Sequence, residues 1–193
     1  FKAIAGNTAL HFASIVGRTD NVKFWLSRFP KWDLEKKNKV VGGVALGNAV
    51  YMGPNRFDLV KVLLNHRASM SLTNYSGASI LMSLCASEDC DPELVKLVLE
   101  SKNCPSVNYR RHGQTLKWRN IYRLARALVR TKLSKSGLMV SLARACGSTA
   151  LHYAVRRGDV DVVNLLLHHG ADPSLTDGLG KSPMDYCDAF PEL

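Results

Sequence analysis

The amino-acid sequence predicts an all-α repeat solenoid, in which helix-turn-helix units are joined by extended finger hairpins and interrupted by one basic helical insertion. Three observations predict it. An eight-residue frame occurs twice, weaker versions of the frame recur at nearly constant spacing, and the apolar residues between them follow the helical period. The chain has 193 residues, 46% of them hydrophobic, which is enough for one continuous core shared by stacked units.

The frame reads GNTALHFA at residues 6–13 and GSTALHYA at residues 147–154. A turn containing glycine and a second apolar segment follow each copy. Weaker copies begin at Gly42 and Gly77, and a fifth begins at Gly180. The starting glycines are separated by 36, 35, 70 and 33 residues, so one interval spans two periods.

Within each unit, the apolar spacing predicts two helices. Leu151 and Ala154 recur at i and i+3 in the first helix, and residues 59, 60, 63 and 64 form an apolar face in the second. Small residues such as Ala154 allow neighbouring units to approach closely. Neither helix can bury its apolar face alone, so the stacking of units supplies the core.

Local signals mark the ends of these helices. Thr8 and Thr149 stand where a helix N-cap is needed. Gly17, Gly158 and Gly170 stand where a helix ends and a left-handed backbone conformation is needed.

The period near 33 and the repeated T-A-L-H-x-A signature resemble the ankyrin repeat family. Residues 165–172 (LLLHHGAD) and 173–177 (PSLTD) are similar to the end of that family's second helix and the segment after it. The resemblance covers about 6–110 and 147–193. It implies that His11 and His152 are structural, with each imidazole bonding to the backbone of the neighbouring finger.

The segment between Gly77 and Gly147 departs from the repeat. Residues 113–116 begin like another copy, and residues 116–130 then form a basic amphipathic pattern. Its apolar stripe consists of Trp118, Ile121, Tyr122, Ala125, Leu128 and Val129, and we expect an opposite stripe of Arg119, Arg123, Arg126 and Arg130. Before Gly147 there is no segment like residues 165–172, which mark the end of the second helix in a repeat. The predicted division is therefore 1–112 (three repeats), 113–146 (an insertion or a decayed repeat) and 147–193 (one repeat and part of another).

The net charge of +10 is concentrated in this part of the chain. Residues 101–158 hold 13 of the 26 Lys and Arg and no Asp or Glu, and the remaining 13 basic and 16 acidic residues give a net charge of −3. A basic face of this kind suits an acidic protein, a phosphate polymer or an anionic lipid surface.

The five cysteines are odd in number and irregularly spaced, which favours a reducing compartment, the cytoplasm or the nucleus. Cys85, Cys90, Cys104 and His112 fit no familiar zinc pattern, and no metal or cofactor is expected. No apolar run is long enough for a membrane-spanning helix. The absence of an initial Met predicts an excerpt of a longer protein, which as a fragment is expected to be monomeric.

The sequence is compatible with three hypotheses about function, each of a different class. The first is a protein-binding scaffold or adaptor, the second is a scaffold whose basic insertion binds nucleic acid or an anionic membrane, and the third is an enzyme. Nothing in the sequence resembles a nucleophile elbow, a phosphate-binding loop or a catalytic carboxylate pair, so no catalytic residue is expected. The first function is favoured, because ankyrin repeats bind proteins with finger tips and the helices of their concave face.

The family resemblance supplies candidate contacts on these two surfaces. The finger-tip candidates are Lys39, Asn74, Tyr75, Asp177 and Leu179. The inner-helix candidates are Phe12, Ser14, Asn48, Ser83, Tyr153 and Arg156. Arg119, Arg123, Arg126 and Arg130 are the candidates on the basic insertion.

Overall fold

The structure is a computed structural model that describes residues 4–52, 56–101 and 103–189. Within these ranges the chain is helical and contains no β-strand. Its α-helices are α1 (Ala9–Val16), α2 (Thr19–Arg28), α3 (Ala45–Met52), α4 (Arg56–Asn65), α5 (Ile80–Cys85), α6 (Pro92–Leu99), α7 (Leu116–Arg130), α8 (Gly137–Ala145), α9 (Ala150–Arg157) and α10 (Val160–His168). Two short 3₁₀ helices, η1 (Ile4–Gly6) and η2 (Met184–Ala189), lie near the two ends of the described chain.

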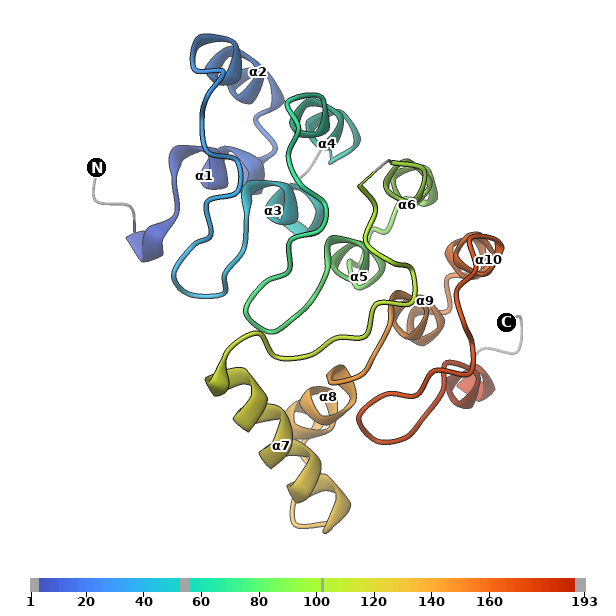
Figure 1. Cartoon of the computed structure of the whole chain (residues 1–193). Helices are drawn as coiled ribbons and strands as arrows, with labels where there is room; N and C mark the ends of the chain where they lie inside the picture. Colours follow the sequence, from blue (N-terminus) through green and yellow to red (C-terminus); the bar gives the residue numbers. More distant parts are fainter. Residues whose placement is uncertain (1–3, 53–55, 102, 190–193) are drawn as a thin grey trace.

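Eight of the helices form two parallel rows (Figure 1). The inner row is α1, α3, α5 and α9, in which each helix contacts the next. The outer row is α2, α4, α6 and α10, and each member packs on the inner helix that precedes it in the chain. This arrangement confirms the predicted all-α repeat solenoid.

The ends of the helices follow the predicted signals. Thr8 is the N-cap of α1, where its side chain accepts a hydrogen bond from the backbone N–H of His11. Gly17 and Gly158 follow α1 and α9 with φ values of 69° and 72°, in the left-handed region that favours glycine. The repeated frame therefore specifies where each first helix begins and ends.

The core lies between the two rows and between successive units. Leu10, Leu46, Leu81 and Leu151 occupy the same position of the four inner helices, and all four are buried. Ala49 and Ala154 are also buried, which allows α3 and α9 to lie close to their neighbours. These positions make the apolar contact continuous along the stack.

A finger connects each unit to the next, and its two arms are joined by backbone hydrogen bonds. In the second finger the N–H of Asn74 donates to the carbonyl of Ala78 at 3.1 Å, and in the fourth the N–H of Asp177 donates to the carbonyl of Lys181 at 2.7 Å. The third finger has the same pairing, but it joins Arg111 to Ser148 at 2.9 Å. The chain therefore leaves the solenoid after Arg111 and returns to it at Gly147, so residues 112–146 are attached at the tip of this finger.

The segment beyond that tip forms a helical hairpin. Its two helices, α7 and α8, pack on each other and project beyond the fingers (Figure 1). Meanwhile α5 contacts α9 directly, so neither helix of the hairpin stands between them in the inner row. The domain boundaries stay a prediction, and this geometry favours an insertion over a decayed repeat.

Membrane-spanning helices are not found in the described ranges, where every helix is too short or too polar to cross a bilayer.

Candidate partner-binding groove

A groove of about 490 Å³ lies on the concave side of the solenoid, between α3, α5 and the fingers that precede these helices. Its floor comes from the inner helices, and its wall comes from residues 41–44 and 72–74. Arg111 and Tyr153 line it as well. The inner-helix residues that line it and remain at least partly accessible are Gly47, Asn48, Tyr51, Ser83 and Ala86.

Asn48 gives this groove a polar group that is not satisfied within the described chain. The Nδ2 atom of its side chain is buried and has no hydrogen-bond partner there. A buried donor without an acceptor costs about 1–3 kcal/mol of folding free energy. Because Asn48 as a residue is only half-buried, a turn of its side chain can bring this donor to a carbonyl oxygen of a bound partner.

Arg111 connects three parts of the molecule near one end of the groove. Its Nη1 donates to the hydroxyl of Tyr153 at 2.6 Å, and its Nη2 donates to the hydroxyl of Ser76. The guanidinium also lies over the ring of Tyr122, 5.9 Å from its centroid. The second finger, the hairpin and α9 are therefore held together by one side chain.

Tyr122 supports the same junction from the hairpin. Its hydroxyl donates to the carbonyl of Ser76 at 2.7 Å, and its ring is buried. Burial raises the pKa of this hydroxyl, so it remains a neutral donor near pH 7. No sequence motif indicated Arg111, although this residue holds the finger position that Asn38, Asn74 and Asp177 hold in other copies.

The two histidines of the repeated frame are structural, as predicted. The Nδ1 atom of His152 accepts from the backbone N–H of Thr149 at 3.1 Å, and its Nε2 contacts the carbonyl of Lys181 in the next finger, also at 3.1 Å. His11 contacts the carbonyl of Gly43 in the same way. Because a backbone N–H only donates and a carbonyl only accepts, Nδ1 accepts and Nε2 donates in both imidazoles.

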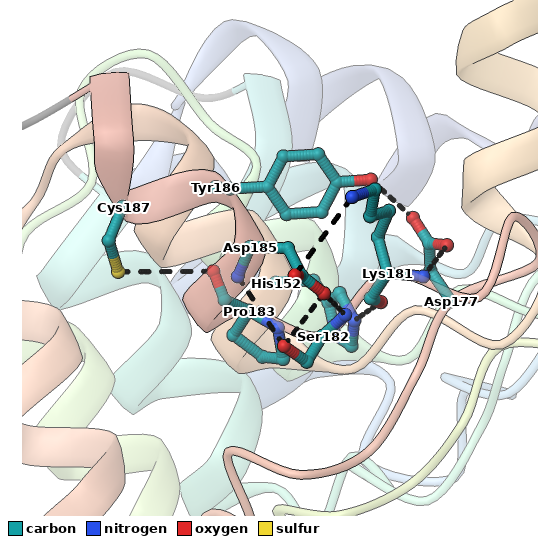
Figure 2. A network of polar contacts seen from close by, with 8 residues as sticks. All are labelled: His152, Asp177, Lys181, Ser182, Pro183, Asp185, Tyr186 and Cys187. Atoms are coloured by element: carbon teal, nitrogen blue, oxygen red, sulfur yellow. Dashed lines mark hydrogen bonds and ion pairs between the residues drawn. The ribbon is translucent and has the colours of Figure 1, made fainter.

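The carbonyl of Lys181 belongs to the polar network that closes the fourth finger (Figure 2). Asp177 accepts hydrogen bonds from the backbone N–H groups of Leu179 and Lys181 and from the hydroxyl of Tyr186, the last at 2.6 Å. Burial, with Asp177 beside it, raises the pKa of Tyr186 to about 12. These contacts fix the shape of the finger.

We expect the stability of the solenoid to fall as the pH decreases below about 6.5. Burial lowers the pKa of His152 from its usual value of 6.5, so the unfolded chain binds a proton more readily than the folded one. The free energy that His152 contributes is therefore present above that pH and is lost as the pH falls toward the folded pKa. Urea unfolding between pH 5 and pH 8 measures this slope.

The matched variants for this measurement are His152→Gln and His169→Gln, since His169 is exposed at the end of α10. His152→Gln should melt at a lower temperature at pH 8 and show a flatter pH dependence. His169→Gln should retain the slope of the parent chain. An unchanged slope in His152→Gln would mean that another group causes the acid sensitivity.

The candidate contact residues divide into three groups by exposure. Phe12, Lys39, Arg119, Arg123 and Arg130 are exposed. The half-buried ones are Asn48, Asn74, Tyr75, Ser83, Arg126, Tyr153, Arg156 and Leu179. Of these, the groove brings together Asn48, Asn74, Ser83 and Tyr153, which come from three inner helices and one finger.

Two candidates are corrected. Ser14 is fully buried in α1, and Asp177 is buried within the network of the fourth finger, so neither side chain is available to a partner. The family resemblance placed Ser14 on the correct helix but did not give its depth. The finger-tip position of Asp177 suggested exposure, whereas its carboxylate is used to hold the backbone of the finger.

The expected arginine stripe differs in one part from the structure. Arg123 is exposed, but Arg126 is half-buried and the side chain of Arg130 turns toward the fourth finger. The Nη2 atom of Arg130 donates to the carbonyl of Gly178 at 3.2 Å. Arg126 packs closely on the same glycine, because a Cβ atom added to Gly178 would lie only 3.1 Å from Cδ of Arg126. Arg126 and Arg130 therefore contact the fourth finger, while Arg119, Arg123 and Arg130 remain exposed on the hairpin.

Among the described residues, no group of three or more His, Cys, Asp or Glu side chains is arranged to hold a metal ion. None of the five cysteines forms a disulfide within the part of the chain that the structure describes.

Comparisons with known proteins agree with this architecture. The chain is 47% identical over 55 residues to "Palmitoyltransferase ZDHHC13" of Homo sapiens and 44% identical over 55 residues to "Palmitoyltransferase ZDHHC17" of Rattus norvegicus. A third relative is "Putative palmitoyltransferase ZDHHC13" of Danio rerio, which is 42% identical over 53 residues. Each match covers 28% of this chain and 8–9% of the relative, so the chain spans only a small part of these proteins.

The sequence model described as ankyrin repeats (3 copies) matches residues 46–177, which is more than half of the chain. With its two rows of helices, its connecting fingers and its structural histidines, the chain belongs to the ankyrin repeat family.

Proposed function

We propose that this chain is a scaffold or adaptor module that binds an extended segment of a partner protein in the groove between α3 and α5. The observation that carries the proposal is the Nδ2 donor of Asn48, which is covered and unsatisfied in the free chain and lies beneath a concave and largely apolar surface. An extended peptide presents a backbone carbonyl at regular intervals, and one of these can accept from Asn48. Ankyrin repeats in general mediate protein–protein interaction, which supports the proposal.

The chemistry of the groove defines the kind of segment that fits. Tyr51 is exposed at its edge and Leu72 is half-buried in its wall, so apolar side chains of the partner gain contact area there. Ser83 and Tyr153 provide hydroxyl groups on the floor. We therefore expect a segment with alternating apolar residues and an accessible backbone, bound without catalysis by this chain.

The relatives share only an ankyrin-repeat region with this chain. That shared region supports a recognition role, and we assign the acyl-transfer activity of the relatives to their other parts. Their names describe palmitoyltransferases, and the region shared with this chain is only 8–9% of each. We propose that the ankyrin repeats contribute partner selection wherever a catalytic domain accompanies them. We also propose the cytoplasm or nucleus as the compartment, which the lack of a disulfide among the five described cysteines supports.

Gly47→Leu is expected to abolish peptide binding in the groove while leaving the fold intact. A Cβ at Gly47 meets only one atom within 4 Å, so the larger side chain fills the groove and not the core. Gly47 lies within α3, where its replacement by leucine also favours the helix by up to about 1 kcal/mol. Peptides selected from a displayed random library against the parent chain provide the ligands, and fluorescence anisotropy gives their Kd.

Lys61→Leu on α4 is the matched control, because it adds the same side chain to an exposed position outside the groove. The control should bind the selected peptides as the parent does. Asn48→Ala should weaken binding by about tenfold, the value expected for one hydrogen bond to a buried donor. Equal affinity in the parent and Gly47→Leu would show that the peptides bind elsewhere.

A further inference from the structure

The loop between α7 and α8 is the outermost part of the helical hairpin, farthest from both rows of helices (Figure 1). Two leucines are displayed there: Leu133 is 77% exposed and Leu138 is 65% exposed. Lys132 and Lys135 are also exposed and alternate with them. We call this group, residues 132–138, the hairpin tip.

The hairpin tip has a defined shape. The N–H of Lys132 donates to the carbonyl of Val129 at 3.1 Å, and the N–H of Ser134 donates to the carbonyl of Leu128 at 3.1 Å. At the start of α8 the N–H of Val140 donates to the carbonyl of Ser136 at 3.0 Å. The leucines therefore protrude from an ordered turn, and their exposure does not result from an unstructured loop.

The charge around the hairpin tip has one sign. No Asp or Glu occurs anywhere between residues 101 and 158, and Arg123 and Lys117 are exposed along α7. Two exposed apolar side chains on an outer turn, whose charged neighbours along the chain are all cations, match a surface with an apolar interior beneath a negatively charged layer. An anionic lipid bilayer has this layering.

Two other partner classes match the hairpin tip less well. Nucleic acid recognition gains from exposed aromatic rings that stack on bases, but Tyr122 is buried and Trp118 packs against it with ring centroids 5.6 Å apart. An acidic protein would need a pocket shaped to receive the leucines, whereas a bilayer accepts them without one.

We propose that the hairpin tip is a peripheral membrane contact, in which Leu133 and Leu138 enter the lipid interface while Lys132 and Lys135 bind anionic headgroups. This contact is separate from the groove between α3 and α5, so a bound bilayer leaves the groove open. It is a reversible contact, because two leucines and a few cations do not anchor a protein permanently.

The test is co-sedimentation of the full chain with vesicles of 70% phosphatidylcholine and 30% phosphatidylserine, in 0.1 M and 0.5 M KCl. The parent chain should bind these vesicles in 0.1 M KCl, bind less in 0.5 M KCl, and not bind pure phosphatidylcholine. Lys132→Gln with Lys135→Gln should reduce the partition coefficient roughly 30-fold, because each lysine near an anionic surface contributes about a fivefold factor. Leu133→Ser with Leu138→Ser should reduce it to a similar extent.

The matched control is Lys31→Gln with Lys36→Gln, which removes the same charge from exposed positions near the first finger. It should bind nearly as the parent does, which separates the hairpin tip from the effect of net charge. A separate measurement follows the entry of residue 133 into the lipid interface. The tryptophan emission of Leu133→Trp should shift further to the blue than that of the parent chain when anionic vesicles are added.

The proposal is overturned if the control loses as much affinity as the lysine pair of the hairpin tip, or if the leucine pair has no effect. It is also overturned if the chain binds a double-stranded DNA probe but not the anionic vesicles. Far-ultraviolet circular dichroism of each variant confirms that the exposed substitutions leave the helices intact.

Discussion

Leu151→Ala should destabilise the solenoid by about 2–5 kcal/mol, the range for removing a fully buried leucine from a packed core. Leu151 is 2% exposed and lies in α9, which contacts α5 on one side and α10 and η2 on the others. The truncation therefore leaves a cavity where two halves of the inner row meet. Urea unfolding of the two proteins, followed by circular dichroism, measures the loss as a lower midpoint at a similar slope.

Leu167→Ala on the neighbouring helix α10 is the control, because Leu167 faces outward and is partly exposed. Leu167→Ala should lower the urea midpoint much less than Leu151→Ala does. A midpoint in Leu151→Ala equal to that of the parent would contradict the repeat register, because every inner helix carries a leucine at this position.

Replacing residues 112–146 by the dipeptide Tyr-Ser should remove membrane binding completely and still give a protein that unfolds cooperatively. The dipeptide copies Tyr75 and Ser76, which form the tip of the second finger between Asn74 and Gly77. Arg111 and Ser148 are already joined by a backbone hydrogen bond, and α5 already contacts α9. The shortened chain therefore closes the third finger without moving either row.

This replacement also tests the proposed insertion. The shortened protein should lose nearly the same free energy on Leu151→Ala as the full chain, since α9 packs mainly on α5, α10 and η2. If the shortened protein aggregates or melts without cooperativity, α7 and α8 belong to the core of the solenoid. The decayed-repeat interpretation of 113–146 then becomes correct.

The sequence specified the repeated elements well, because their signals are local and are written more than once. The frames at 6–13 and 147–154 contain the N-cap, the structural histidine and the packing leucine, and the glycines after them end each helix. Each signal acts within one or two helical turns. Such features can be predicted without knowing how distant segments meet.

The hairpin and its contacts were harder to predict, because they depend on segments far apart in the chain. The helical period assigned Tyr122 to an apolar face but did not show that it bonds to Ser76. The same period assigned Arg130 to a polar face, although the carbonyl that it contacts belongs to Gly178 in the fourth finger. The accessibility of Asp177 likewise depends on Tyr186, which reaches it from the following 3₁₀ helix.

The position of the hairpin has a consequence for how the chain folds. Successive inner helices are one repeat apart in sequence, except at α5 and α9, where the segment between them is about twice as long. Closing the longer loop costs additional chain entropy, roughly 0.6 kcal/mol for a doubling of length. The contacts between α5 and α9 are also the least local in the inner row, and nonlocal contacts form slowly. We therefore expect the first three units and the last two to nucleate separately, with their docking at Leu151 as a late step.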